Sequence, residues 1–129
     1  MHEQERHVST PDGEMRVLVV HPDGPGPFPV GVVYMDAMGW REAVWANARR
    51  LAAAGYCCVV PDLLHRVPEH EQPLPARMGE EGFRDRVRAV ASGVTPAMAL
   101  ADTRAALGAV AGDPAAAAGR VALVGYCMG

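Results

Sequence analysis

The sequence contains no lysine, few aromatic residues and no apolar run of the ~18 residues that a membrane-spanning helix needs, so we expect no membrane partner. All its basic residues except histidine are arginines, spread from Arg6 to Arg120, and the formal net charge is −3. Such scattered charge gives no reason to expect nucleic-acid binding. The first ten residues include two glutamates and lack an apolar stretch, unlike a secretory signal. Three cysteines do not make a disulfide framework, and we expect a cytoplasmic protein.

What the chain does have is the length and apolar content of one globular domain, with 129 residues of which half are hydrophobic. Residues 7–22 predict a β-hairpin around a Pro-Asp-Gly turn. The apolar run 30–35 predicts a buried strand, 41–54 a helix, and 56–60 a second buried strand. Strand, helix and strand in this order make one βαβ unit.

A second helix is expected over 95–112, with Thr95 as its N-cap, and it leads to an apolar strand over 120–124. Between the two units, 63–94 is less regular and carries a helical pattern over 80–91. Alternating strands and helices indicate an α/β fold, with a mostly parallel sheet covered by helices on both faces. The apolar face expected for the helix over 95–112 consists of Leu100, Leu107 and Val110.

The motif Gly125-Tyr126-Cys127-Met128-Gly129 directly follows the last of these strands. In a Gly-x-nucleophile-x-Gly elbow, the nucleophile lies in a strained turn from strand to helix, and the glycines let neighbouring backbone approach. The spacing therefore indicates a nucleophilic Cys127. The alternative is a buried structural cysteine in a glycine-rich turn.

Residues 30–66, followed by 121–129, resemble the dienelactone hydrolase family of α/β-hydrolases. The shared features are an acidic residue after a buried strand, a helix ending in Ala-x-x-Gly-Tyr, the sequence Pro-Asp-Leu at the next strand end, and Gly-Tyr-Cys-x-Gly. The resemblance covers most of 15–129. It implies a three-layer α/β-hydrolase fold and hydrolysis of lactones or related esters through a cysteine.

Carried over by position, Cys127 is the nucleophile that forms a thioester acyl-enzyme. The backbone N–H groups of Ala37 and Met128 form the oxyanion hole. Asp36, where the family usually has glutamate, interacts with the resting cysteine and helps to activate it. Aspartate is one methylene shorter, and the alternative for Asp36 is a cap on the helix that begins near Trp40.

The substrate-binding candidates are weaker. The family binds a substrate carboxylate through arginines, and Arg84, Arg77 or Arg88 could serve, the alternative being a solvated helix face. Trp40 lines an apolar pocket or packs in the core. No His/Cys cluster has metal-ligand spacing, so we expect no metal and no cofactor. Four further residues are expected to be structural or inert: Cys57, Cys58, Asp62 and His65.

The general base is the part that the sequence does not supply. The fold orders its catalytic groups as nucleophile, acid and histidine, but every histidine here precedes Cys127. We therefore expect 1–129 to be the N-terminal part of a single hydrolase domain, inactive as an esterase by itself and acting on a small ester or lactone when whole. The alternatives are a non-catalytic remnant, a half-domain that needs a partner chain, or an acyltransferase with the same thioester. An unpaired edge on the strand 120–124 predicts self-association.

Overall fold

The structure is a computed structural model that describes residues 1–128, with Ala118 described by its backbone only. Five strands and three α-helices follow one another along the described chain, and two short 3₁₀ turns lie between β4 and α2. Their bounds are β1 His2–Thr10, β2 Gly13–His21, β3 Phe28–Tyr34, α1 Glu42–Ala53, β4 Cys57–Pro61, α2 Phe83–Gly93, α3 Pro96–Gly108 and β5 Ala116–Gly125.

The strands form one sheet in the order β1-β2-β4-β3-β5. The expected hairpin is confirmed, since β1 pairs with β2 in antiparallel fashion around residues 11 and 12. β4 and β5 both run parallel to β3, but β2 is antiparallel to β4. The sheet that the sequence predicts as mostly parallel is thus a mixed one, in which the two pairings of β3 are parallel and the two pairings of β2 are antiparallel. The antiparallel part comes from the β1–β2 hairpin, whose two strands run in opposite directions. The hairpin lies on one side of the sheet, and its inner strand, β2, runs antiparallel to β4.

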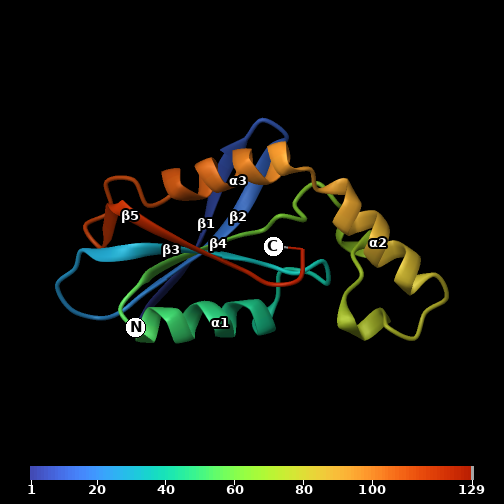
Figure 1. The fold of residues 1–129 in the computed structure, drawn as a ribbon, viewed down its shortest axis with the longest axis horizontal. Coiled ribbons are helices and arrows are strands. Elements are labelled where there is room, and N and C mark those ends of the chain that lie inside the picture. The colour runs from blue at the N-terminus through green and yellow to red at the C-terminus, as the bar shows by residue number, and fades with distance from the viewer. Residues whose placement is uncertain (129) are drawn as a thin grey trace.

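Helices cover both faces of the sheet, as predicted. Figure 1 shows α1 below the strands and α3 above them. α1 buries Val44, Ala48 and Ala52, residues spaced by four along one stripe, and it contacts β2, β3 and β4. The helix ends before Gly55, whose φ of +107° is a left-handed conformation that glycine adopts without a steric penalty.

The start of α3 is also as the sequence predicted. The N–H of Met98 donates to Thr95 Oγ1 at 3.2 Å, and Pro96 occupies the first turn, where a helix needs no N–H donor. The predicted apolar face is confirmed only in part: Val110, just after the helix, is 1% exposed and Leu107 packs against the core. Leu100 is 51% exposed, whereas Asp102 and Thr103 are buried.

The burial of Asp102 has a clear physical cause. Arg66 Nη1 and Nη2 donate to its two carboxylate oxygens, at 2.8 and 2.9 Å, and His65 Nε2 lies 3.1 Å from it. A buried carboxylate is tolerated when it is paired and hydrogen-bonded in this way. α3 therefore packs on the segment after β4 through charge as well as through apolar contact.

Two parts of the molecule lie outside the packed layers. α2, yellow in Figure 1, extends beyond the carboxyl ends of β3 and β4 and buries only Val90. β5 is an outer strand, and its apolar residues Val121 and Leu123 are 42% and 62% exposed. Val121 and Leu123 pair with Val30 and Val32 of β3, which belong to the same core cluster as Ala106 of α3. The main contacts of α3 are with β1 and β4, and so α3 leaves Val121 and Leu123 exposed.

None of the helices among the described residues is long and apolar enough to cross a membrane. The cytoplasmic location stays a prediction.

Candidate active site

The loops after β3 and β5 leave the sheet side by side. The two strands are parallel, and the last residue of β3, Tyr34, pairs with the last residue of β5, Gly125. Asp36 and Cys127 each come two residues after this pair. The fold thus brings two of the predicted site residues to the same end of the sheet, the carboxyl end, where open α/β sheets bind their ligands.

Cys127 has the backbone conformation that an elbow requires. Its φ is +59°, and it is the only non-glycine residue with a positive φ in the described part of the chain. A residue with a β-carbon pays a steric penalty for this conformation, and such residues cluster at functional sites. The side chain is exposed. The structure therefore does not place Cys127 in the core, which was the alternative reading.

Asp36 is held by the segment that follows it. Arg41 donates to both carboxylate oxygens, at 2.7 and 3.1 Å, and the N–H of Met38 donates to Oδ1 at 2.9 Å. Burial opposes ionisation of the carboxyl, but the Arg41 guanidinium and the Met38 N–H outweigh it and hold the pKa of Asp36 below its usual value. Asp36 is thus ionised at neutral pH.

The alternative role for Asp36, a cap on the following helix, was wrong. The N-cap residue of α1 is Arg41, and no side chain caps its N-terminus. Asp36 instead closes a short turn on its own backbone through Met38. Among the described residues, the carboxylate is hydrogen-bonded to Arg41 and Met38 and not to Cys127.

The two predicted oxyanion donors flank this pair. Ala37 follows Asp36 and is 1% exposed, and Met128 follows Cys127 and packs against the α1-side core. Neither backbone N–H donates a hydrogen bond within the described residues. Gly125 ends β5, and Gly129, the second predicted elbow glycine, lies outside the described residues.

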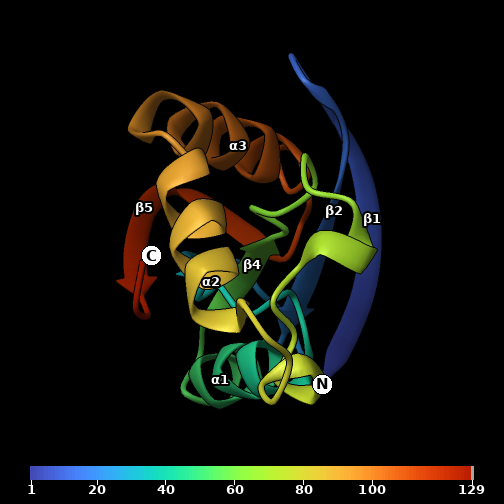
Figure 2. The ribbon, with the colours of Figure 1, turned by 90° about the vertical axis from the view of Figure 1, so that its right-hand side faces the viewer.

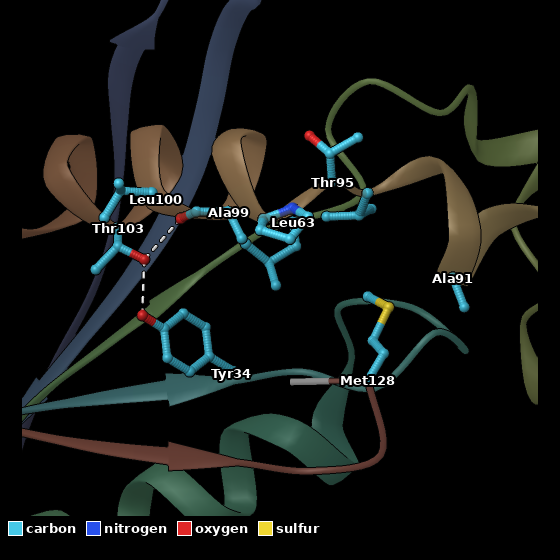
Figure 3. A pocket seen from close by; sticks show the side chains of 10 residues that line it. Tyr34, Leu63, Ala91, Thr95, Ala99, Leu100, Thr103 and Met128 are labelled. Atoms are coloured by element: carbon cyan, nitrogen blue, oxygen red, sulfur yellow. Dashed lines mark hydrogen bonds between the residues drawn. The ribbon is translucent and has the colours of Figure 1, made fainter.

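A hollow of about 380 Å³ opens beside Met128 (Figure 3). Its walls come from the end of β3, the segment after β4, and the helices α2 and α3. Figure 3 shows Tyr34 reaching across it to Thr103, with the two hydroxyl oxygens 2.7 Å apart. Sequence reasoning missed this hollow because Tyr34 and Thr103 are 69 residues apart, and no local pattern links them.

The structure places Trp40 in the core. The side chain is 7% exposed, its Nε1 donates to the backbone oxygen of Val60 at 3.1 Å, and the Arg16 guanidinium lies 4.6 Å from the ring centre. Arg16 also pairs with Asp62, which is 2% exposed and accepts from the N–H of Leu64. Asp62 is thus structural, as expected, and the surroundings of Trp40 are those of a packing residue.

Arg84 lies on α2, at a second hollow of about 610 Å³ that includes Met38. Glu80 and Asp85 line the same hollow, so two carboxylates accompany the arginine there. Arg84 itself is exposed. The structure does not bring it into the hollow beside Met128.

The other two cysteines contrast with Cys127. Cys57 and Cys58 are fully buried in β4, and burial raises the pKa of their thiols to about 11 and about 12. Thiols of this kind are protonated and unreactive at neutral pH. Among residues 1–128, no three His, Cys, Asp or Glu side chains gather closely enough to hold a metal ion.

The parallel strands, the helices on both faces and a strained cysteine turn at the carboxyl end of the sheet define an α/β-hydrolase type of arrangement. A sequence model described as the dienelactone hydrolase family matches residues 15–129, and the chain belongs to this family. A provisionally named carboxymethylenebutenolidase of Methylorubrum extorquens is 29% identical over 122 residues, which cover 92% of this chain and 38% of that protein.

Solved structures have a similar fold. A provisionally named dienelactone hydrolase from Klebsiella pneumoniae has a structure that superposes with a TM-score of 0.74 at 24% sequence identity. The match covers all of this chain and 52% of the Klebsiella chain. The structure described as m3DLH superposes with a TM-score of 0.67 at 27% sequence identity. The match covers 99% of this chain and 50% of the m3DLH chain. The chain therefore spans about half the length of these structures.

Proposed function

We propose that this protein is a hydrolase of carboxylic esters or lactones that uses Cys127 as its nucleophile. The observation that carries the proposal is the positive φ of Cys127 in an exposed turn at the carboxyl end of β5, beside the loop that follows β3. Membership of the dienelactone hydrolase family supports small esters or lactones as substrates. We further propose that 1–129 forms part of a single hydrolase domain, since it spans about half of the solved relatives.

The first chemical step is acylation. The thiolate of Cys127 attacks the carbonyl carbon of the ester, and the carbonyl electron pair moves to oxygen. The N–H groups of Ala37 and Met128 stabilise this oxyanion, and donors fixed by the backbone are effective because they need no reorganisation. Collapse of the intermediate breaks the C–O bond and leaves a thioester, which water then cleaves.

Asp36 is proposed to interact with the resting thiol, as the family resemblance implies. Its ion pair with Arg41 keeps it ionised and fixes the turn that leads into Ala37. Asp36 therefore has a second, positioning effect on the oxyanion donor. Arg84, with its own hollow, is the candidate for contact with a more distant part of the substrate.

The test is acylation of the chain by p-nitrophenyl acetate. We expect one equivalent of nitrophenolate, a mass increase on the peptide containing Cys127, and no sustained turnover, because no histidine of the described residues is hydrogen-bonded to Cys127. Cys127→Ala should abolish both the burst and the mass shift. Cys57→Ala, which removes a buried thiol of the same sheet, is the matched control and should acylate normally. Acylation that persists in Cys127→Ala would show that the nucleophile is wrong.

A second candidate function is favoured by the exposed face of β5. Val121 and Leu123 are apolar and largely exposed on a strand whose one described neighbour is β3. Unpaired apolar edges of this kind pair with other chains. Under this alternative, the chain is a half-domain that associates through β5, with itself or with a partner chain.

A further inference from the structure

We propose that the hollow beside Met128 binds a neutral, mainly apolar part of the ester and discriminates against a carboxylate at that position. This inference rests on the proposed function, since it takes Cys127 as the nucleophile. It deepens that function by naming the substrate class: esters whose acyl chain carries no charge.

The hollow is placed to receive the acyl chain. Met128, which follows Cys127 directly, forms one wall, and Tyr34, the β3 residue paired with Gly125, forms another. Cys127 is not itself a lining residue, but it adjoins Met128 in the chain, and we take the acyl chain on its sulfur to enter this space. Its volume of about 380 Å³ is within the usual range of ~300–1,000 Å³ for small-molecule sites.

The walls are apolar and uncharged. Seven of the ten lining residues are aliphatic, proline or methionine, and no Arg, His, Asp or Glu of the described chain lines the hollow. Placing a carboxylate in such surroundings removes its hydration without giving it a counter-ion, which is unfavourable. A hydrocarbon chain gains by leaving water in the same place.

The polar groups that are present offer few donors. Thr103 Oγ1 donates its proton to the backbone oxygen of Ala99 at 2.7 Å. The Tyr34 hydroxyl, 2.7 Å from the same Oγ1, must then donate to Thr103, because the threonine proton is already used. Both hydroxyl protons are thus consumed within the wall (Figure 3). Thr95, the third hydroxyl, accepts from the Met98 N–H and keeps its own proton, but it lies at the exposed start of α3, where water competes for it.

The contrast with the second hollow strengthens the inference. Arg84, the arginine expected to bind a carboxylate, lies beside Met38 and is accompanied by Glu80 and Asp85. The described walls of the hollow beside Met128 thus carry no charged side chain, whereas the hollow beside Met38 carries one arginine and two carboxylates.

The experiment compares two esters that differ only at the far end of the acyl chain, p-nitrophenyl hexanoate and mono-p-nitrophenyl adipate. Acylation forms the C–S bond to Cys127, breaks the C–O bond to nitrophenolate, and releases the thiol proton to buffer. Each rate constant is divided by that for free cysteine. We expect the neutral ester to react about tenfold faster by this measure. A normalised ratio near one overturns the inference.

A charge placed in the wall should reverse the preference. Leu100 lines the hollow and is 51% exposed, so Leu100→Arg adds a cation at its rim without opening the core. We expect the hexanoate-to-adipate ratio to fall about threefold or more. Ala111→Arg, an exposed position beyond the other end of α3, adds the same charge elsewhere and is the control. Equal changes in the two variants would show that net charge, not the hollow, sets the preference.

A second pair of reagents separates this inference from the proposed function. N-hexylmaleimide and 6-maleimidohexanoic acid add to a thiol without any acyl transfer, and they differ in the terminal carboxylate. If neither ester acylates Cys127 but the neutral maleimide still reacts about tenfold faster after normalisation, the hydrolase proposal fails and the neutral pocket stands. If the esters acylate Cys127 and both pairs react equally, the pocket fails and the hydrolase proposal stands.

Discussion

β4 and β5 are the two parallel neighbours of β3, one on each side, and their environments are opposite. All five residues of β4 are buried, whereas Val121 and Leu123 of β5 are 42% and 62% exposed. β4 has β2 as its second neighbour, α1 on one face and α3 on the other. β5 has β3 alone among the described residues.

The two strands are similarly apolar, so composition does not explain the difference. Neighbours do, and they also decide the chemistry of the cysteines. Cys57 and Cys58 lie between two strands and two helical layers, while Cys127 lies on the turn after the open strand. The same residue type is thus inert in one strand and available at the end of the other.

The largest expected effect is in thiol reactivity. At pH 8, a thiol with a pKa of about 11 is ionised in roughly one part in a thousand, and the thiolate is the nucleophile. We therefore expect iodoacetamide to alkylate Cys127 at least about a hundredfold faster than Cys57 or Cys58, which are also shielded from the reagent by burial. Peptide mass spectrometry over time measures the three rates. In urea the rates should converge, and rapid labelling of Cys58 in the native chain would contradict the burial of β4.

The next effect is on stability. Val59 of β4 is fully buried, and Val59→Ala should lower the free energy of unfolding by about 2–3 kcal/mol through lost apolar burial and a cavity. Leu123→Ala, at an exposed position of β5, should change it by less than about 0.5 kcal/mol. Urea denaturation followed by circular dichroism measures both. A large loss in Leu123→Ala would mean that β5 is covered, for example by self-association.

Features that depend on local sequence were predictable. Thr95 and Pro96 marked the start of α3, the Pro-Asp-Gly turn marked the hairpin, and the glycine spacing around Cys127 marked the turn that has a positive φ. In each case, a few adjacent residues contain all the physical information, because backbone conformation and capping are local properties.

Features that depend on pairing between distant residues were not predictable. Asp102 is polar and was not expected on the buried face of α3, and its partner Arg66 is 36 residues away. The direction of β2 relative to β4 likewise depends on which strands meet. The Asp36–Arg41 pair was within reach, since the two residues are five apart, but one sequence did not distinguish it from a cap.

A third prediction tests the open edge of β5. If the chain self-associates through this strand, Leu123→Lys should weaken the association about tenfold or more, because a charged side chain on an edge strand opposes pairing. Analytical ultracentrifugation over a concentration series measures the dissociation constant. Ala97→Lys, an exposed position on α3, is the control and should leave it unchanged. Equal weakening in both variants would point to a general charge effect.

The smallest effect concerns Asp36, which follows β3 and so lies between the two strands compared above. Arg41 and the Met38 N–H outweigh the opposing effect of burial and lower the pKa of Asp36 in the folded state. The ion pair therefore stabilises the fold at pH values above the unfolded pKa of about 3.9, and this contribution is lost as the pH falls through the folded pKa. Since the side chains of both partners are 24% exposed, Asp36→Asn should cost only about 1 kcal/mol at pH 7.

The difference between the wild-type chain and Asp36→Asn should accordingly stay constant from about pH 7 to pH 5 and shrink below about pH 4. Urea denaturation at each pH measures it. Asp85→Asn removes an exposed carboxylate that has no ion-pair partner among the described residues, and it should give little difference at any pH. A cost for Asp36→Asn that persists at pH 3 would show that shape, and not charge, holds the turn before Ala37.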